Sequence, residues 1–334
     1  MKTSALGDLA HSYAMQSRNS AVKQNMQRLT AELTSGQVSD MRKAAQGNVA
    51  YVNDLERSLK KLGGYELATR EATQFAGGIQ NALGRMSDLS MSFRGIVLGS
   101  TNTSFGQSPN SVQIEARQTL DSMISTLNTS VAGRSLFAGT ATDTQAIAPA
   151  TDILAALGAA MAGVGSVDDM LNAADAWFND PTGFGAVGYR GSEKALAPIA
   201  HSADTTAQFD LRGDNPAFRD TLKSLAVLAI AGDPILGLTP AQQSELFQKS
   251  VSGVIGLSDT LIDLQANVGF QESRLEAQSS RNSAERTALE MARSSLLAVD
   301  PFETATELEQ VQFQLQSLYA VTSRMSQLSL LNYI

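Results

Sequence analysis

The side chains that most often catalyse reactions or bind metal ions are few in this sequence and widely spaced. The two histidines, His11 and His201, lie far apart, and there is no cysteine, which excludes disulfides and thiolate metal sites. A zinc-binding His-Glu-x-x-His motif is also absent. His201 is followed by Ser202 and Asp204, and we interpret this short cluster as a loop and not as a catalytic triad.

Paired carboxylates can act together as a general acid and a general base, and Asp168 and Asp169 are adjacent. Neighbouring residues of a helix point in different directions, so we interpret this pair as the acidic first turn of a helix. Neither a phosphate-binding loop nor a nucleophile with a base accompanies them. We therefore expect no catalytic residue, no bound metal and no cofactor, and we predict that the protein is not an enzyme.

The distribution of charge argues against two classes of partner. The net charge is −8, whereas binding to nucleic acid needs clustered lysine and arginine, so we expect no nucleic-acid partner. No stretch approaches the roughly 18 consecutive apolar residues of a membrane span, so we expect no membrane insertion. The N-terminal segment also lacks the apolar run of a cleavable signal peptide, and we expect any export to use another route.

The elements that remain to be explained are helices, beginning with one at the N-terminal end. Five apolar residues follow the three-four spacing of a coiled-coil seam, with Asn19 in the one gap: Met15, Val22, Met26, Leu29 and Leu33. Ser35-Gly36 predicts the end of this helix. The residues from Met15 to Leu33 form one apolar face of the helix, and this face needs a partner that buries it.

Further helical segments follow up to about residue 133. A second run of apolar residues is expected to be interrupted at Gly63-Gly64, and a third extends over Phe75–Ile96. Ser108-Pro109 predicts the start of another helix, with serine as the cap and proline in the first turn, and Gly133 predicts its end. Residues 134–140 indicate a short strand or turn packed on these helices.

The sequence changes in character between residues 141 and 250. Glycine and proline become frequent, and short apolar runs alternate with turn signals such as Asp180-Pro181 and Asp233-Pro234. Thirteen acidic and six basic residues lie between Ala141 and Gly253, so this segment accounts for most of the net negative charge. We predict a separate, smaller, acidic domain of mixed helix and strand, inserted between the helical ends of the chain.

Helical spacing returns after the insert. Leucines and related residues recur every seven positions from Leu261 to Leu296, and Asp300-Pro301 predicts a break. A second seam then follows the three-four spacing: Leu308, Val311, Leu315, Leu318 and Met325. Arg324 is the only charged residue after Glu309, so this helix is poorly suited to stand alone in water and is expected to pack in an assembly.

Two positions within these helices leave alternatives open. Asn282 occupies a seam position of the seven-residue repeat, where it could either set the register between helices or lie solvated at the edge of the seam. Gly77-Gly78 could permit a close approach of a second helix or simply weaken its own helix.

The fold predicted from these patterns is mainly α-helical. Both chain ends form a long, antiparallel, coiled-coil-like bundle, to which a short β-turn element and the smaller mixed α/β insert are added. We expect an assembly helix at residues 1–40 that pairs with another at 301–334, and a helical rod built from residues 41–140 and 251–300. Residues 141–250 form the insert.

Several segments resemble the flagellin superfamily, and most closely its hook-filament junction branch, the hook-associated protein 3 family. LTAELTSG at Leu29–Gly36 is similar to the family's QLSSG segment, and GRSLFAGT at Gly133–Thr140 is similar to its GRYLFSGT turn. ANVGFQESRLE at Ala266–Glu276 and the tail SLLNYI at Ser329–Ile334 continue the likeness, which covers residues 1–140 and 250–334. The acidic DDP motif that usually follows the Ser-Gly is missing, so the connection after Gly36 is expected to differ.

The resemblance implies a structural role outside the cell. It implies a bacterial flagellar subunit, exported unfolded by the flagellar type III apparatus without a cleavable signal peptide, with a variable, surface-exposed insert at 141–250. Identical subunits would form a ring at the hook-filament junction, between an adjacent hook-associated junction protein and flagellin. A cytoplasmic export chaperone would bind the C-terminal helix beforehand. Flagellin itself, or a type III-exported helical interaction protein, are the alternatives.

Overall fold

The computed structural model describes residues 2–40, 49–101, 109–255 and 257–331 of the chain. The chain forms two compact units. The terminal unit comprises Met1–Gly63 and Ser283–Ile334, and the central unit comprises Gly64–Asn282. The fold is mainly α-helical with a few short antiparallel strands, as the sequence predicts.

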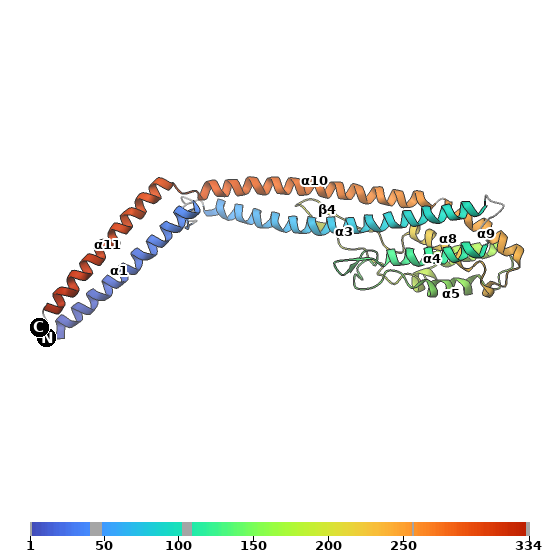
Figure 1. Ribbon diagram of the computed structural model, residues 1–334, viewed down its shortest axis with the longest axis horizontal. Helices are drawn as coiled ribbons and strands as arrows, with labels where there is room; N and C mark the ends of the chain where they lie inside the picture. The colour runs from blue at the N-terminus through green and yellow to red at the C-terminus, as the bar shows by residue number, and fades with distance from the viewer. Residues whose placement is uncertain (1, 41–48, 102–108, 256, 332–334) are drawn as a thin grey trace. The chain divides into compact units, whose positions relative to one another are not determined.

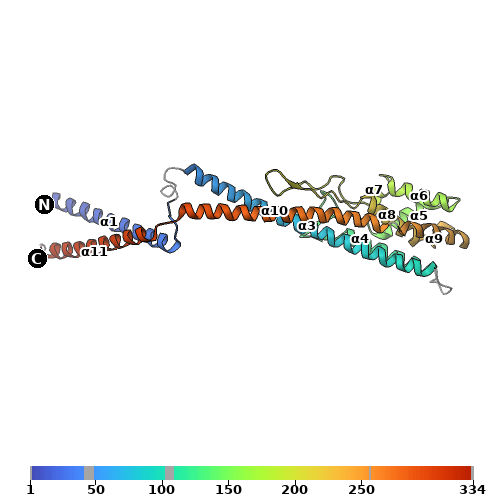
Figure 2. The ribbon, with the colours of Figure 1, turned by 90° about the horizontal axis from the view of Figure 1, so that it is seen from above.

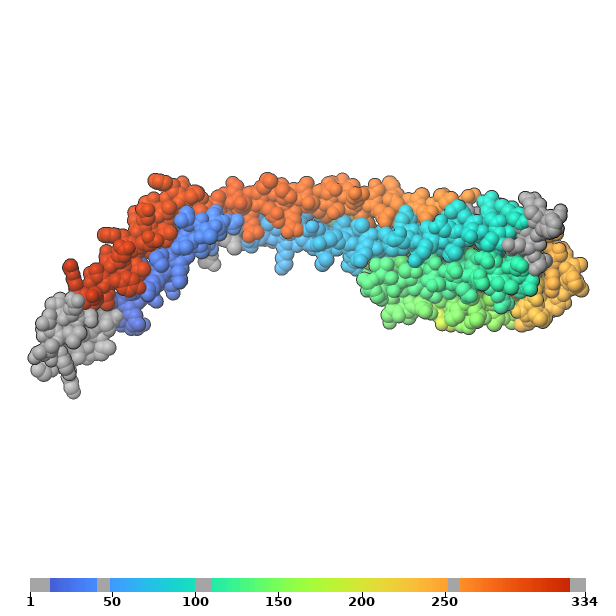
Figure 3. Space-filling view, in the orientation of Figure 1, coloured from blue at the N-terminus to red at the C-terminus, as the bar shows by residue number. Residues whose placement is uncertain are grey.

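Two helices that lie at opposite ends of the sequence pack together in the terminal unit. Helix α1 spans Lys2–Ser35 and α11 spans Pro301–Leu331. They run antiparallel, with the N-terminal end of α1 beside the C-terminal end of α11 in both ribbon views (Figures 1 and 2). Figure 3 shows the two helices touching along the visible face. The antiparallel pairing predicted for the chain ends is therefore confirmed.

The boundaries of α1 and α11 follow the expected signals. Helix α1 ends at Ser35, and Gly36 adopts the left-handed conformation with φ of 70°, which glycine reaches without steric cost. The backbone N–H of Gly36 donates to the carbonyl of Glu32 at 2.8 Å. Before α11, the carboxylate of Asp300 accepts from the backbone N–H of Phe302 at 2.8 Å and so caps the helix that Pro301 begins.

The longest helix passes through a position where we expected an interruption. Helix α3 spans Val49–Thr101 without a break at Gly63-Gly64. Glycine disfavours a helix by about 1 kcal/mol relative to alanine, but apolar residues on both sides of the pair are buried, among them Val52, Leu62 and Ala72. Their burial outweighs the local cost, so the predicted interruption is wrong.

Within the central unit, α3 packs antiparallel against α10, which spans Leu257–Leu297. The side-chain amide of Gln80 donates to the backbone carbonyl of Gln265 at 3.0 Å. A Cβ placed on Gly77 would lie 3.7 Å from Glu272 Oε1, which is ordinary contact distance. The seven-residue repeat predicted for α10 is buried at Leu261, Val268 and Leu275.

Helix α4 spans Pro109–Leu127 and is followed by a small hairpin. Strand β1 (Ser130–Val131) pairs antiparallel with β2 (Arg134–Ser135). The turn residues Ala132 and Gly133 have φ of 51° and 77°, the positive values that a tight two-residue hairpin turn of this hand requires. The sequence predicts that this helix ends at Gly133, but it ends six residues earlier, at Leu127. The reason is that Val131 belongs to the hairpin and not to the apolar face of the helix.

The hairpin decides between the two alternatives that the sequence leaves open for Gly77-Gly78 in α3. A Cβ on Gly78 would lie 2.6 Å from Val131 Cγ2 and 3.3 Å from Leu136 Cδ1, so only glycine permits this approach. The close-approach alternative for Gly77-Gly78 therefore holds at Gly78. The element that approaches is the hairpin, however, and not a second helix.

Short elements fill the segment between residues 141 and 255. They are α5 (Ala150–Met161), α6 (Val167–Asn179), α7 (Phe184–Val187), β3 (Ile199–Ala200), β4 (Thr206–Ala207), α8 (Pro216–Ile230), the 3₁₀ helix η1 (Pro234–Leu236) and α9 (Pro240–Ile255). Strands β3 and β4 form a second antiparallel hairpin. Asp168 and Asp169 lie in the first turn of α6, where the Ser166 hydroxyl accepts from the Asp169 N–H, so their interpretation as a helix start is confirmed.

The insert shares its core with the helices that precede and follow it. One buried apolar cluster joins Leu83 of α3, Leu120 of α4, Ile153 of α5, Leu222 of α8 and Leu275 of α10. Two side chains of α4, Gln113 and Arg117, each donate to the backbone carbonyl of Ala229 in α8 at 3.0 Å. The core thus crosses the boundary expected near residue 141, and the five-segment division of the chain stays a prediction.

Candidate assembly interface

The predicted seam of α1 faces α11, but the pair buries it unevenly. Leu29 is 1% exposed, whereas Met15, Val22 and Met26 are only half-buried, and Leu33 is 37% exposed. Four of the five predicted residues are therefore at least partly covered in the terminal unit. Leu33, near the end of α1, remains open to solvent.

The seam of α11 shows the same pattern. Val311 is 7% exposed, and Leu308, Leu315 and Leu318 are half-buried. Met325 lies within α11, but its side chain lies outside the described residues. Across the pair, Lys23 Nζ lies 5.6 Å from the centroid of the Tyr319 ring, a cation–π distance that fixes which turns of α1 and α11 face each other.

The chain segments beside these two helices are joined by backbone hydrogen bonds. Gln37 and Ala298 form an isolated antiparallel bridge. The N–H of Val38 donates to the carbonyl of Leu297 at 2.8 Å, and the N–H of Val299 donates to the carbonyl of Gly36 at 3.1 Å. We call residues 36–38 and 297–300 the joint, because they tie the end of α1 to the start of α11.

A buried carboxylate supports the joint from within α1. Glu32 is 4% exposed, pairs with Arg28 one turn earlier at 2.8 Å, and accepts from the backbone N–H of Ser39 at 2.9 Å. Burial alone would raise the pKa of Glu32, but the bond from Ser39 and the charge of Arg28 outweigh it and hold that pKa below its ordinary value. Glu32 is therefore ionised at neutral pH and orders the chain that leaves α1.

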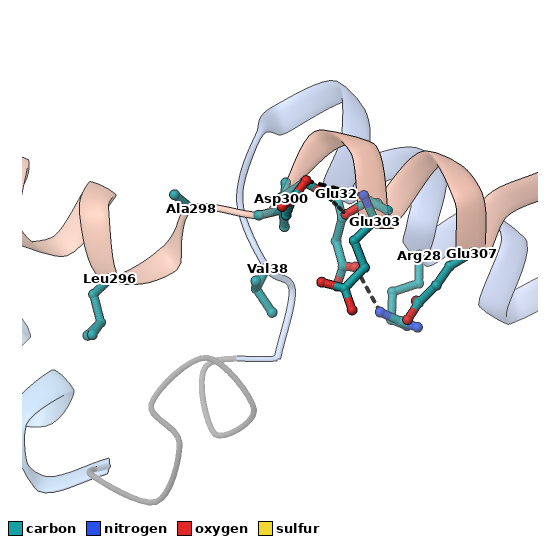
Figure 4. A pocket seen from close by; sticks show the side chains of 10 residues that line it. Arg28, Glu32, Val38, Leu296, Ala298, Asp300, Glu303 and Glu307 are labelled. Atoms are coloured by element: carbon teal, nitrogen blue, oxygen red, sulfur yellow. Dashed lines mark hydrogen bonds and ion pairs between the residues drawn. The ribbon is translucent and has the colours of Figure 1, made fainter.

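A hollow of about 290 Å³ opens beside the joint, as Figure 4 shows. Its lining includes Arg28 and Glu32 of α1 and Asp300, Glu303 and Glu307 near the start of α11. Within the described ranges, no group of three histidine or acidic side chains is placed to hold a metal ion. Asp300 is occupied as the cap of α11, and Glu32 by Arg28 and Ser39, so these groups serve the joint.

Aromatic side chains on the outer face of α11 were not predicted as part of the interface. Phe302 and Phe313 are 84% and 71% exposed, and their eleven-residue separation places them on one face of the helix. Val311, in the seam, lies on the opposite face. The three-four spacing identifies apolar residues that repeat along one face of a helix. It does not identify a second face that carries only two large apolar residues. Their size and the low charge of α11 are the signals that could have found them.

The connection that follows Gly36, which is expected to differ from that of the flagellin superfamily, is described only in part. Gln37, in the segment where the acidic DDP motif is missing, forms the bridge with Ala298, whereas Met41 and Arg42 lie outside the described residues. Among the described helices, none is both long and apolar enough to cross a membrane.

Comparisons with known proteins agree with this architecture. Residues 256–334, which include α10 and α11, match the family model of the bacterial flagellin C-terminal helical region. A structure described as a flagellar hook-associated protein from Vibrio parahaemolyticus has a TM-score of 0.51 and 16% identity, covering 74% of this chain and 97% of that one. FlgL of Bacillus cereus has a TM-score of 0.51 and 12% identity, covering 72% and 99%.

At these identities, the likeness to the two structures shows a shared fold. The comparison with curated proteins finds no match to this chain.

Proposed function

We propose that this chain is a structural subunit of the bacterial flagellum that acts as an adaptor at the hook-filament junction. The observation that carries the proposal is the antiparallel pair of α1 and α11, whose second helix lies in the segment that matches the flagellin C-terminal helical region. The fold shared with a protein described as a flagellar hook-associated protein, and with FlgL of Bacillus cereus, supports the junction over other positions.

The proposed assembly interface consists of the two seams and their open edges. Met15, Val22, Met26, Leu29 and Leu33 would act with Leu308, Val311, Leu315, Leu318 and Met325. Two helices alone leave most of these side chains half-buried, and apolar area removed from water contributes roughly 25 cal/mol per Å². A neighbouring subunit that covers these edges, together with exposed Phe302 and Phe313, would therefore stabilise the pair.

The partners proposed on this basis are other flagellar components. Identical subunits would form a ring, with an adjacent hook-associated junction protein on one side and flagellin on the other. A cytoplasmic export chaperone would cover α11 before export, since that helix exposes aromatic residues and carries little charge. The assembled protein would be extracellular and would act without a cofactor.

Flagellin itself is the second candidate, because the matched family model is that of flagellin. Immunogold labelling of intact flagella with an antibody to residues 141–250 separates the two. We expect a single band at the tip of the hook. Label along the whole filament would show that the chain is flagellin and would overturn the junction assignment.

The same labelling tests the interface. Replacing Leu315 and Leu318 with serine should abolish the band, whereas replacing the exposed Gln314 and Gln316 with serine should preserve it. The melting temperature of each purified variant is measured alongside, because loss of the band counts only if the central unit still folds. A band of normal intensity from the Leu315→Ser/Leu318→Ser variant would exclude these residues from the interface.

A further inference from the structure

The β3–β4 hairpin of the central unit is held by contacts at both of its ends. Beyond β4, the ring of Phe209 meets that of Phe75 in α3, with centroids 5.5 Å apart. Phe75, Phe209, Leu196 and Ile199 line an apolar hollow of about 320 Å³. The hairpin thus forms one wall of this hollow.

The other end of the hairpin lies on α10 through a buried hydrogen bond. Asn282 is buried, and its side-chain amide donates to the backbone carbonyl of His201 at 3.0 Å. Its amide oxygen accepts from Gln278 at 2.7 Å, so both ends of the Asn282 side chain are occupied. Asn282 therefore neither sets a helix register nor lies solvated, as the sequence suggested; it anchors the hairpin.

The side chain of His201 lies in the same contact and is buried. Its Nδ1 lies 3.2 Å from the Thr205 hydroxyl, which in turn lies 2.6 Å from the Ser202 hydroxyl. A hydroxyl both donates and accepts, so this bond can serve either protonation state of the imidazole.

The surrounding charges, in contrast, favour the neutral form. Burial lowers the pKa of His201, and the positive charges of Arg274 and Arg281 on α10 lower it further, against an opposing hydrogen bond with the Thr206 backbone. Asp204, the acidic residue of the hairpin turn, is exposed, and within the described residues no carboxylate forms an ion pair with the His201 ring. A proton on His201 would thus place a buried positive charge beside the two exposed arginines.

We propose that the β3–β4 hairpin is an acid-released strap, which lies on α10 while His201 is neutral and separates from it when His201 binds a proton. Separation breaks the bond from Asn282 and lets the imidazolium reach water. It also moves Ile199 away from the apolar hollow and widens it.

The direction with pH follows from proton linkage. A histidine that binds protons more weakly in the docked state favours docking above its ordinary pKa of about 6.5, and this preference is lost as the pH falls below that value. Between pH 7.5 and 5.5 the opening equilibrium constant of the hairpin should rise by up to about tenfold.

Hydrogen exchange of the full chain measures this constant, once each amide rate is corrected for the intrinsic effect of pH. The reporters are hairpin amides such as that of His201, which donates to Thr205, and the amides of α8 serve as an internal reference. Histidine NMR on the same sample gives the pKa of the imidazole directly, and we expect it below 6.5.

Three variants separate the proposal from general acid sensitivity. His201→Gln should remove the pH dependence of hairpin opening, and His11→Gln, which removes the other histidine, should leave it unchanged. Asn282→Ala should increase opening at both pH values while preserving the ratio between them. The proposal is overturned if hairpin opening in the natural chain does not rise, if His201→Gln rises equally, or if His201 titrates at or above 6.5.

Discussion

Gly78 illustrates how a single residue sets the distance between two elements of the central unit. The missing side chain lets the β1–β2 hairpin approach α3 so closely that a Cβ would lie 2.6 Å from Val131 Cγ2. We predict that Gly78→Ala lowers the free energy of unfolding by about 1–3 kcal/mol, because overpacking forces the hairpin outward. Urea denaturation followed by circular dichroism measures the change.

Gly77 supplies the matched control, since it lies beside Gly78 in the same helix. A Cβ there meets Glu272 Oε1 at an ordinary 3.7 Å, so Gly77→Ala should be neutral or stabilising. The double variant Gly78→Ala/Val131→Ala should recover part of the loss, because it removes the clashing methyl group. Equal effects of Gly77→Ala and Gly78→Ala would show that helix propensity, and not the hairpin, determines the result.

The residue-level predictions from the sequence were most successful where a contact follows a local repeat. Leu29 and Val311 each lie in a three-four spacing within their own helix, and both are buried; their part in assembly stays a prediction. Asn282 was noticed for its place in a repeat, but its partner, His201, is 81 residues away and contributes only a backbone carbonyl. No pattern of side-chain types can indicate such a partner, because every residue carries that carbonyl.

At the scale of elements, helix α3 shows that a local signal can be outweighed by packing. Gly63-Gly64 has the composition of a helix break, but the seam before it and the seam after it are both buried. The end of α4 shows the converse. Val131 continues a helical spacing, but the turn at Ala132-Gly133 places it in a strand, and alanine is not a residue from which a positive φ is predicted.

The glycine pair in α3 leads to a prediction about stability. Both residues are helical, and a Cβ on either would meet nothing within 4 Å. We predict that Gly63→Ala and Gly64→Ala each raise the free energy of unfolding by roughly 1 kcal/mol, since alanine loses less backbone entropy on entering a helix. Thermal and urea unfolding of the two single variants and the double variant measure this gain. A loss of stability would mean that α3 is not helical through these residues in solution.

At the scale of the molecule, glycine and proline become more frequent after residue 141, and this marks a change to shorter helices and strands. It does not mark the start of a separate hydrophobic core. The short elements of the insert are punctuated by glycine and proline as expected, but α8 buries its residues in the same cluster as α4. Composition reports the length of elements, because turns need particular residues. It does not report which elements share a core, because apolar side chains of any segment can fill it.

The α1–α11 pair, in contrast, has little core of its own. Leu29 and Val311 are the buried members of the predicted seams among the described side chains, and the others are half-buried or exposed. Most helical stability in proteins comes from burial of an apolar face, and isolated helices are marginal in water. Closing two chain ends around more than two hundred intervening residues adds an entropic cost that short loops avoid.

We therefore predict that α1 and α11 open readily in the free subunit and become stable only on assembly. In hydrogen exchange of the free subunit, amides of residues 310–328 should be protected by no more than about tenfold, equivalent to roughly 1.4 kcal/mol. Amides of α8, most of whose residues are buried, should be far more strongly protected and report the stability of the central unit. In assembled material, the protection of residues 310–328 should rise toward that of α8. Strong protection of these amides in the free subunit would contradict the prediction, because it would show that the two helices already form a stable pair. Assembly would then have to use the outer face of α11, at Phe302 and Phe313, since the seam between α1 and α11 would already be formed.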